Sequence, residues 1–195
     1  MTYEIVVVGA SWGGLHALER VLTGLPEQFE PAVVIAQHRS PQSQRDGLAT
    51  LLEQYAHRPV QDAGDKDPIE PGHVYLAPPD YHLLIEPGHF ALSVDERVQH
   101  ARPSIDVLFE SAADAYRERT VGVVLTGANR DGAAGLARIK ELGGVAIVQS
   151  PHEALAHAMP RAALAATPEA DAILPLDEIP LFLTGLCVNP QASRR

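Results

Sequence analysis

The chain has 195 residues, 46% of them apolar, which is enough for one compact domain with a sizeable core and argues against disorder. Acidic residues outnumber basic ones by 25 to 15, and this balance argues against non-specific nucleic-acid binding, which needs a positive surface. The apolar runs are far shorter than the ~20 residues that cross a bilayer, and the single cysteine, Cys187, excludes an internal disulfide. We therefore expect a cytoplasmic protein without a secretory leader or membrane insertion, forming a single domain over residues 1–195.

The first part of the chain alternates between buried strands and amphipathic helices. Continuous apolar runs at residues 5–8 and 32–36 are typical of parallel strands buried on both faces. Apolar residues at helical spacing follow each run, over residues 15–22 and 48–55.

The middle of the chain, residues 59–95, has short strand-like runs broken by Gly and Pro. Glu70-Pro-Gly-His73 recurs as Glu86-Pro-Gly-His89, and each Pro-Gly pair predicts a turn. These turns would bound antiparallel strands at residues 74–76, 83–86 and 90–94.

After Pro103 the strand–helix alternation returns. We expect helices at residues 104–116, 133–142, 160–166 and 178–186, and strands at 121–125, 145–148 and 172–174. The sum predicts a three-layer α/β fold: a mostly parallel, doubly wound sheet with an inserted antiparallel hairpin region.

The glycine-rich turn after the first strand, Gly9-Ala-Ser11-Trp-Gly-Gly14, fits two chemistries. A dinucleotide site would need G-x-G-x-x-G and an acidic residue at the end of the second strand, where this chain has Gln37-His38. No tyrosine has a lysine four places later, and the Gly-Lys-Ser/Thr of a Walker loop is missing. The turn also matches the G-x-S-x-G pattern that exposes a nucleophilic serine beside a helix N-terminus.

A serine nucleophile needs a base, and candidates follow two other strands. His38 ends the second strand, and Asp131 follows the strand at 121–125. The carboxyl ends of parallel strands share one edge of the sheet, so Ser11, His38 and Asp131 are expected to meet there. Histidine would accept the serine proton, and an aspartate behind it would fix the tautomer. The order Ser, His, Asp differs from that of the α/β-hydrolases.

Simpler interpretations of each residue stand beside this one. Ser11 can be only a turn residue, His38 a hydrogen-bonded strand end, and Asp131 an N-cap for the helix from Ala133. His152 and His157 are five residues apart, off one helical face, which argues against a zinc pair, and we expect no metal site.

Taken together, the motifs resemble the catalytic domain of the chemotaxis protein-glutamate methylesterase family, CheB. That family carries G-A-S-x-G-G after a strand, Q-H after a second strand, and L-T-G-x-x-x-D-G-A. This chain has Gly9 to Gly14, Gln37-His38 and Leu125 to Ala133 in the same order. Further blocks agree along nearly the whole chain: Arg102 to Phe109, Pro71-Gly-His73, Tyr75 to Pro78 and Met159-Pro-Arg161.

The resemblance implies hydrolysis of glutamyl methyl esters on the cytoplasmic helices of methyl-accepting chemoreceptors, and possible deamidation of glutamines. It assigns Ser11 as nucleophile, His38 as base and Asp131 as the histidine's partner, with the backbone amide of Ala128 as an oxyanion donor. No metal or cofactor is implied. A separate regulator or methyltransferase of the same pathway would be a further partner.

Three departures from the family pattern bear on specificity and control. The family usually has an N-terminal receiver domain, whereas this chain starts at the catalytic strand, so we expect a stand-alone form. Trp12 stands where the family has a small residue or Thr, and Ala-Asn-Arg precedes Asp131 in place of Met-Gly-Asn. Trp12 is about equally compatible with a pocket wall and a core anchor, and in an inactive binding module it would block the pocket.

Three arginines, Arg39, Arg102 and Arg130, fall near the predicted rim. Each is most simply a solvated charge, but together they predict a positive patch that meets the acidic methylation helices of a receptor. With Trp12 they are the candidate substrate-binding residues. The alternatives are a serine esterase or amidase of the same fold with another substrate, and an inactive binding module.

Overall fold

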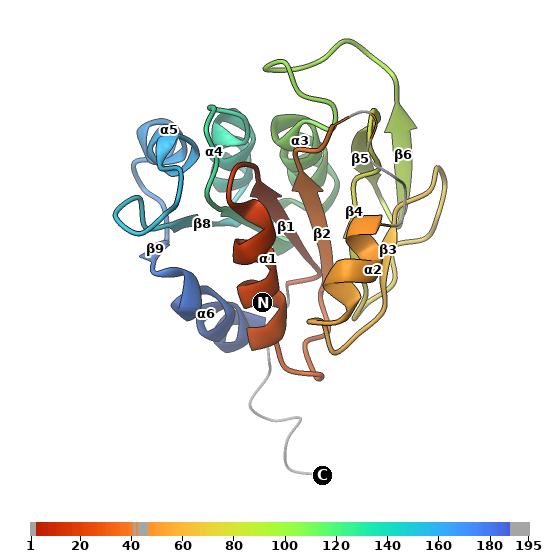
Figure 1. Ribbon diagram of the computed structural model, residues 1–195, viewed down its shortest axis with the longest axis horizontal. Helices are drawn as coiled ribbons and strands as arrows, with labels where there is room; N and C mark the ends of the chain where they lie inside the picture. Colours follow the sequence, from red (N-terminus) through yellow and green to blue (C-terminus); the bar gives the residue numbers. More distant parts are fainter. Residues whose placement is uncertain (1–2, 41, 43–46, 188–195) are drawn as a thin grey trace.

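The computed structural model describes residues 3–40, 42 and 47–187, and it shows a seven-stranded parallel sheet between two layers of helices (Figure 1). The sheet strands are β1 (Ile5–Ala10), β2 (Ala32–Gln37), β3 (Val60–Asp62), β4 (Val74–Leu76), β7 (Thr120–Val124), β8 (Val145–Gln149) and β9 (Ala172–Leu174). A separate hairpin consists of β5 (His82–Glu86) and β6 (His89–Ser93). The helices are α1 (Gly14–Gly24), α2 (Gly47–Glu53), α3 (Ile105–Tyr116), α4 (Ala133–Glu141), α5 (Ala158–Ala166) and α6 (Ile179–Cys187).

The strand order, β3-β4-β2-β1-β7-β8-β9, places β1 in the centre. The chain first winds outward from β1 through β2 to β4, then returns to the other side of β1 with β7, β8 and β9. The winding therefore reverses at β1 and β7. Open α/β sheets bind ligands outside the carboxyl ends of the strands at such a reversal.

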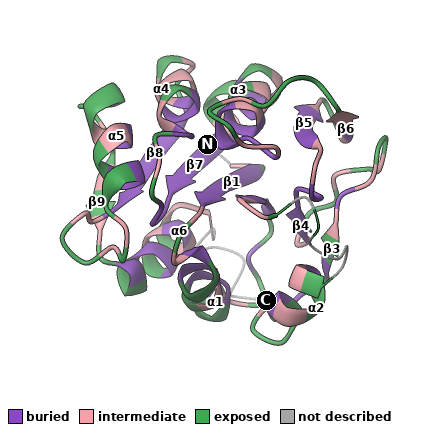
Figure 2. Cartoon of the chain, turned by 45° about the horizontal axis from the view of Figure 1, so that its top comes forward, coloured by how far each residue is buried: buried purple, intermediate pink, exposed green. Residues whose placement is uncertain are grey.

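Side chains of the central strands alternate between two cores, one on each face of the sheet. Val6 and Val8 pack with α1, α2 and α6, whereas Ile5 and Val7 pack with α3, α4, α5 and the hairpin. Figure 2 shows the central strands buried along their length between the helices. Burial on both faces explains why these strands read as continuous apolar runs. The predicted doubly wound fold with an inserted hairpin is confirmed.

One predicted strand pairing is wrong. Residues 74–76 were expected to be antiparallel, but β4 joins the main sheet between β2 and β3, parallel to both. All three of its residues are buried, as in a strand covered on both faces. The turn at Pro71-Gly72 leads into this parallel strand, because the amide of Gly72 donates to the carbonyl of Glu30 at 2.7 Å. Only the second Pro-Gly turn closes a hairpin, between β5 and β6.

Within the described ranges, no helix combines the length and apolar character needed to cross a membrane.

One aromatic side chain of the hairpin packs deep in the core. Phe90 is fully buried and meets the Tyr75 ring edge-on, with 4.7 Å between the ring centroids. We expect Phe90→Ala to lower the free energy of unfolding by about 3–5 kcal/mol, because it leaves a cavity against Tyr75. Urea denaturation measures this change. The exposed Val94→Ala is the control and should change it by less than about 0.5 kcal/mol. Equal effects of the two substitutions would contradict this packing.

Candidate active site

Ser11 lies in the tight turn between β1 and α1. Its amide donates to the carbonyl of Thr126 at 3.0 Å, and its carbonyl accepts from the amide of Gly14 at 2.8 Å. Gly13 has a φ of 81°, a left-handed conformation that favours glycine. The turn places Ser11 just before the N-terminus of α1, whose unpaired amides favour negative charge.

The ring of His38 bridges Ser11 and Asp131. Its Nδ1 is 3.1 Å from Ser11 Oγ, and its Nε2 is 2.8 Å from Asp131 Oδ2. An ionised carboxylate can only accept, so the ring proton sits on Nε2 and donates to Asp131. The lone pair of Nδ1 then faces the Ser11 hydroxyl, which donates to it. The predicted meeting of the three side chains is therefore observed as one hydrogen-bonded chain.

The carboxylate of Asp131 is fully buried and accepts hydrogen bonds on both oxygens. Oδ2 accepts from His38 Nε2 and the amide of Ile105, whereas Oδ1 accepts from Ser104 Oγ and the amide of Asp106, all at 2.7–2.9 Å. Burial alone would raise the pKa of Asp131. The hydrogen bonds from His38 and the two amides outweigh burial and hold that pKa below its usual value.

Asp131 serves a different helix from the one the sequence suggested. It was considered as an N-cap for the helix from Ala133, but that helix, α4, has Gly132 at its N-cap and no side-chain cap. Asp131 instead lies at the N-terminus of α3, where Ser104 is the N-cap residue. The reason is topological: the chain brings the start of α3 against the end of β7, which sequence spacing does not reveal.

Gln37 is a site residue to which the sequence analysis assigned no role. Its Nε2 donates to the carbonyls of both Ser11, at 3.0 Å, and His38, at 3.1 Å. Because both partners are carbonyl oxygens, which only accept, the side-chain nitrogen of Gln37 and not its oxygen must face them. A Cβ on Gly14 would lie 2.1 Å from Gln37 Oε1, so this glycine leaves room for the contact. Gln37 thus ties the turn of the serine to the turn of the histidine.

The backbone amides of Trp12 and Ala128, in the turns after β1 and β7, have no recorded acceptor among the described residues. The neighbouring amides of Ser11 and Gly127 are already used, by the carbonyls of Thr126 and Ala156. The sequence analysis named Ala128 as a donor and missed the Trp12 amide. The signal was available, because the residue after the nucleophile is a common oxyanion donor.

The Trp12 side chain is 69% exposed, which excludes the role of core anchor. Ser11 beside it is partly accessible. Nothing in this arrangement supports a serine covered by the indole.

Comparison with known proteins identifies the family. Residues 6–183 match the family model described as CheB methylesterase. The chain belongs to the CheB methylesterase family. The resemblance inferred from the motifs is confirmed, and so is the enzyme class, an ester hydrolase.

Relatives and a solved structure agree with this membership. A Leptospira interrogans protein is 47% identical over 180 residues, covering 92% of each chain, and its name provisionally gives protein-glutamate methylesterase/protein-glutamine glutaminase. A Caulobacter vibrioides protein with that name is 40% identical, but the match covers only 52% of it. The CheB methylesterase catalytic domain of Thermotoga maritima superimposes with a TM-score of 0.90, at 32% identity, over 95% of this chain and all of that one.

Two of the three predicted arginines line one cavity, and the third lines another; Gln99 lines both cavities. Arg39 is buried and pairs with Asp62, while Arg102 pairs with Asp80; both line a cavity of about 300 Å³ beside His38. Arg130 is exposed and lines a different cavity, of about 390 Å³, against α4 and α5. Arg130 and Asp131 are adjacent in sequence, but Asp131 is buried whereas Arg130 is exposed.

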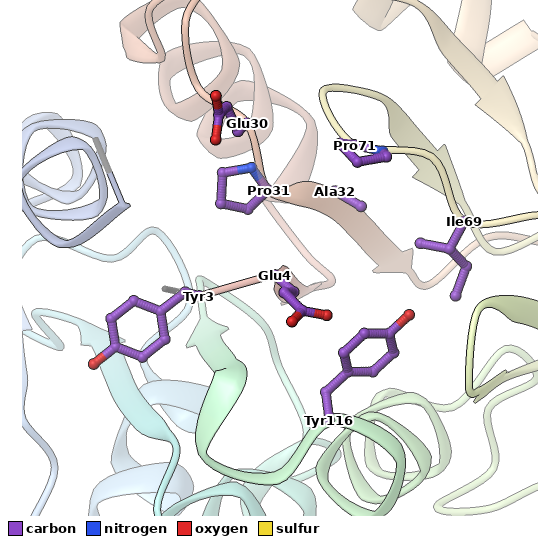
Figure 3. A pocket seen from close by; sticks show the side chains of 8 residues that line it. All are labelled: Tyr3, Glu4, Glu30, Pro31, Ala32, Ile69, Pro71 and Tyr116. Carbon is purple, nitrogen blue, oxygen red and sulfur yellow. The ribbon is translucent and has the colours of Figure 1, made fainter. Parts of the chain in front are cut away.

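A further cavity, of about 220 Å³, lies at the opposite, amino end of β1 and β2 (Figure 3). Tyr3, Glu4 and Tyr116 line it, and none of the predicted site residues does. No cluster of His, Cys, Asp and Glu within the described ranges has a geometry that could hold a metal ion.

Substitution of Gln37 tests whether this residue positions Ser11 and His38. We expect Gln37→Leu to lower kcat roughly 10- to 100-fold with a smaller change in KM, because Ser11 and His38 lose their common tie. The free energy of unfolding should fall by about 1–3 kcal/mol, since two carbonyls lose a donor. Gln61→Leu, on an exposed position of β3, is the control. A variant with normal kcat but reduced stability would show that Gln37 is only structural.

A second carboxyl group lies behind Asp131. Asp106 is buried, its amide donates to Asp131, and its side chain accepts from the amide of Gly135 at 2.8 Å. Burial, together with the Asp131 charge, raises the pKa of Asp106 to about 6. The folded state therefore binds this proton more tightly than the unfolded chain does.

The raised pKa predicts a pH-dependent stability. The contribution of Asp106 is fully present below its ordinary pKa of 3.8 and is lost as the pH rises through about 6. Asp106→Asn cannot ionise, so its stability relative to wild type should rise between pH 4 and pH 6, by at most about 1.4 kcal/mol per pH unit. Urea denaturation at each pH measures this, with the exposed Asp114→Asn as control. A difference independent of pH would contradict it.

Proposed function

We propose that this chain hydrolyses glutamyl methyl esters on the cytoplasmic helices of methyl-accepting chemoreceptors, releasing methanol and a glutamate carboxylate. The observation that carries the proposal is the hydrogen-bonded chain from Ser11 through His38 to Asp131, found in a member of the CheB methylesterase family. The names of its relatives also support deamidation of glutamines by the same site, with release of ammonia.

The geometry supports a two-step acyl transfer. Ser11 Oγ attacks the ester carbonyl carbon while His38 Nδ1 takes the hydroxyl proton. Asp131 holds the Nε2 proton and stabilises the imidazolium that forms. The amides of Ala128 and Trp12 are the available donors for the negative oxygen of the tetrahedral intermediate.

The first step ends when the C–O bond to the methoxy group breaks and His38 gives its proton to the departing methoxide oxygen, which releases methanol. The second step returns the enzyme to its starting state. Water then attacks the acyl group on Ser11 with His38 as base again, which frees the glutamate carboxylate and restores the serine hydroxyl. This chain of residues supplies every proton transfer, and the proposal invokes no cofactor.

The proposed partners follow from the substrate. They are the receptor's cytoplasmic helices and a separate regulator or methyltransferase of the same pathway, in the cytoplasm. Nucleic acid is not among them, because the net charge of -10 disfavours it.

Methanol release from methylated receptor tests the proposal. We expect Ser11→Ala and His38→Ala each to lower kcat by about 10³-fold or more, since each removes a member of one catalytic unit. Ser93→Ala in β6 and the exposed His16→Ala are matched controls and should retain wild-type rates.

Two outcomes would contradict the proposal. Full activity of Ser11→Ala would exclude the mechanism. Hydrolysis of small methyl esters by a wild-type protein that leaves methylated receptor untouched would instead indicate a serine esterase of the same fold with another substrate.

A further inference from the structure

The cavity beside His38 is unusually rich in cationic side chains for an acidic protein. It has a volume of about 300 Å³ and runs from His38 and Asn129 to the loop of residues 94–102. Figure 1 shows this loop arching from the end of β6 to the start of α3, above the carboxyl edge of the sheet. The lining includes three arginines, two histidines and no carboxylate: His38, Arg39, Arg97, Gln99, His100, Ala101, Arg102, Pro103 and Asn129.

Arg102 holds the loop in place and has little left to offer a ligand. Its Nε and Nη2 donate to Asp80 Oδ1 at 3.2 and 2.9 Å, and its Nη1 donates to the carbonyls of Val94 and Asp95. The side chain is only 18% exposed. Arg102 is therefore a structural residue of the cavity wall.

Arg39 forms the opposite wall. Its side chain is 7% exposed, and its Nη2 donates to Asp62 and to the carbonyl of Ala77 at 3.2 and 2.9 Å. Its Nε and Nη1 are buried without a hydrogen-bond partner among the described residues. Arg39 is therefore an enclosed wall residue, whose charge is paired with Asp62.

Arg97 is the cation that remains available. Its side chain is 48% exposed, and its recorded contact is from Nη2 to Asp80 Oδ1 at 3.3 Å. That same oxygen already accepts two closer N–H groups of Arg102. One carboxylate thus faces two guanidinium groups, and Arg97 is the more exposed of the two.

The turn that follows Arg97 brings more donors to the same side. The amide and carbonyl of Val98 pair with those of Ala101 at 3.2 and 2.9 Å. Between them Gln99 and His100 have φ values of 50° and 65°, which non-glycine residues seldom adopt. This backbone is held by both hydrogen bonds, and it places Gln99 and His100 on the cavity lining.

We infer that this cavity is the subsite for a second carboxylate of the substrate, and that Arg97 is the residue that contacts it. A planar guanidinium binds a carboxylate through two parallel hydrogen bonds, and Arg97 has Nε and Nη1 available for this. The inference rests on the proposed function. It adds that the enzyme selects glutamyl esters with an unmethylated acidic side chain nearby on the same helix.

Synthetic helical peptides with one glutamyl methyl ester test this subsite. A single Glu is moved through the positions one, three and four residues from the ester, and each peptide has a counterpart with Gln at that position. We expect wild type to favour the Glu peptide at one position by roughly tenfold in kcat/KM, mainly through KM. The preference should weaken with added salt.

Variants of the full chain assign the preference to one residue. Arg97→Gln should abolish it without slowing the Gln peptide, Arg97→Glu should reverse it, and Arg97→Lys should restore part of it. Arg20→Gln is the matched control. Arg20 is 52% exposed and has one carboxylate partner, Asp177, and neither residue lines the cavity. This variant should keep the wild-type preference.

The outcomes separate the subsite from the proposed function. Equal hydrolysis of Glu and Gln peptides by wild type, or an unchanged preference in Arg97→Gln, would overturn the subsite and leave the methylesterase intact. Failure of wild type to hydrolyse any of these peptides or methylated receptor would overturn both.

Discussion

The hydrogen bonding of one buried carboxylate, Asp131, connects three parts of the catalytic edge: the end of β2, the turn after β7 and the start of α3. Asp131 has no exposed side-chain surface, and a carboxylate in that setting is costly unless hydrogen bonds replace its water. The start of α3 supplies those bonds through two amides and the Ser104 hydroxyl. Together with the hydrogen bond from His38, they hold the pKa of Asp131 below its usual value. The Nε2 proton of His38 is engaged by Asp131, so its Nδ1 lies toward Ser11, as the proposed mechanism requires.

The charged side chains around the cavity beside His38 have two roles: some hold the structure, and one is proposed to contact the substrate. Asp80 and Asp62 each fix an arginine, and those two arginines build the walls of the cavity beside His38. Asp80 is shared with Arg97, the more exposed of its two arginine partners. An acidic protein can in this way present a small positive surface beside its nucleophile without becoming basic overall.

Much of this organisation could be predicted because parallel strands buried on both faces leave continuous apolar runs. The runs at β1, β2 and β7 located their own carboxyl ends, and with them Ser11, His38 and Asp131. The direction of β4 could not be predicted, because three residues carry no directional signal and the nearby Pro-Gly pair favoured a hairpin. The contact of Asp131 with α3 arises from tertiary packing, which sequence spacing does not reveal. The same holds for the hydrogen bond from Gln37 to the carbonyl of Ser11. The role of Arg97 likewise depends on how one loop folds against Asp80.

The separation of the three side chains along the chain has a consequence for folding. Ser11 and His38 are 27 residues apart, and His38 and Asp131 are 93 apart, across the parallel pairs β1–β2 and β1–β7. Non-local parallel pairings form slowly, since loop-closure entropy is spent before their contacts stabilise the chain. The hydrogen-bonded chain can thus exist only after both pairings are complete. Esterase turnover would consequently report on the fully native population, and a collapsed intermediate with correct helices would be silent.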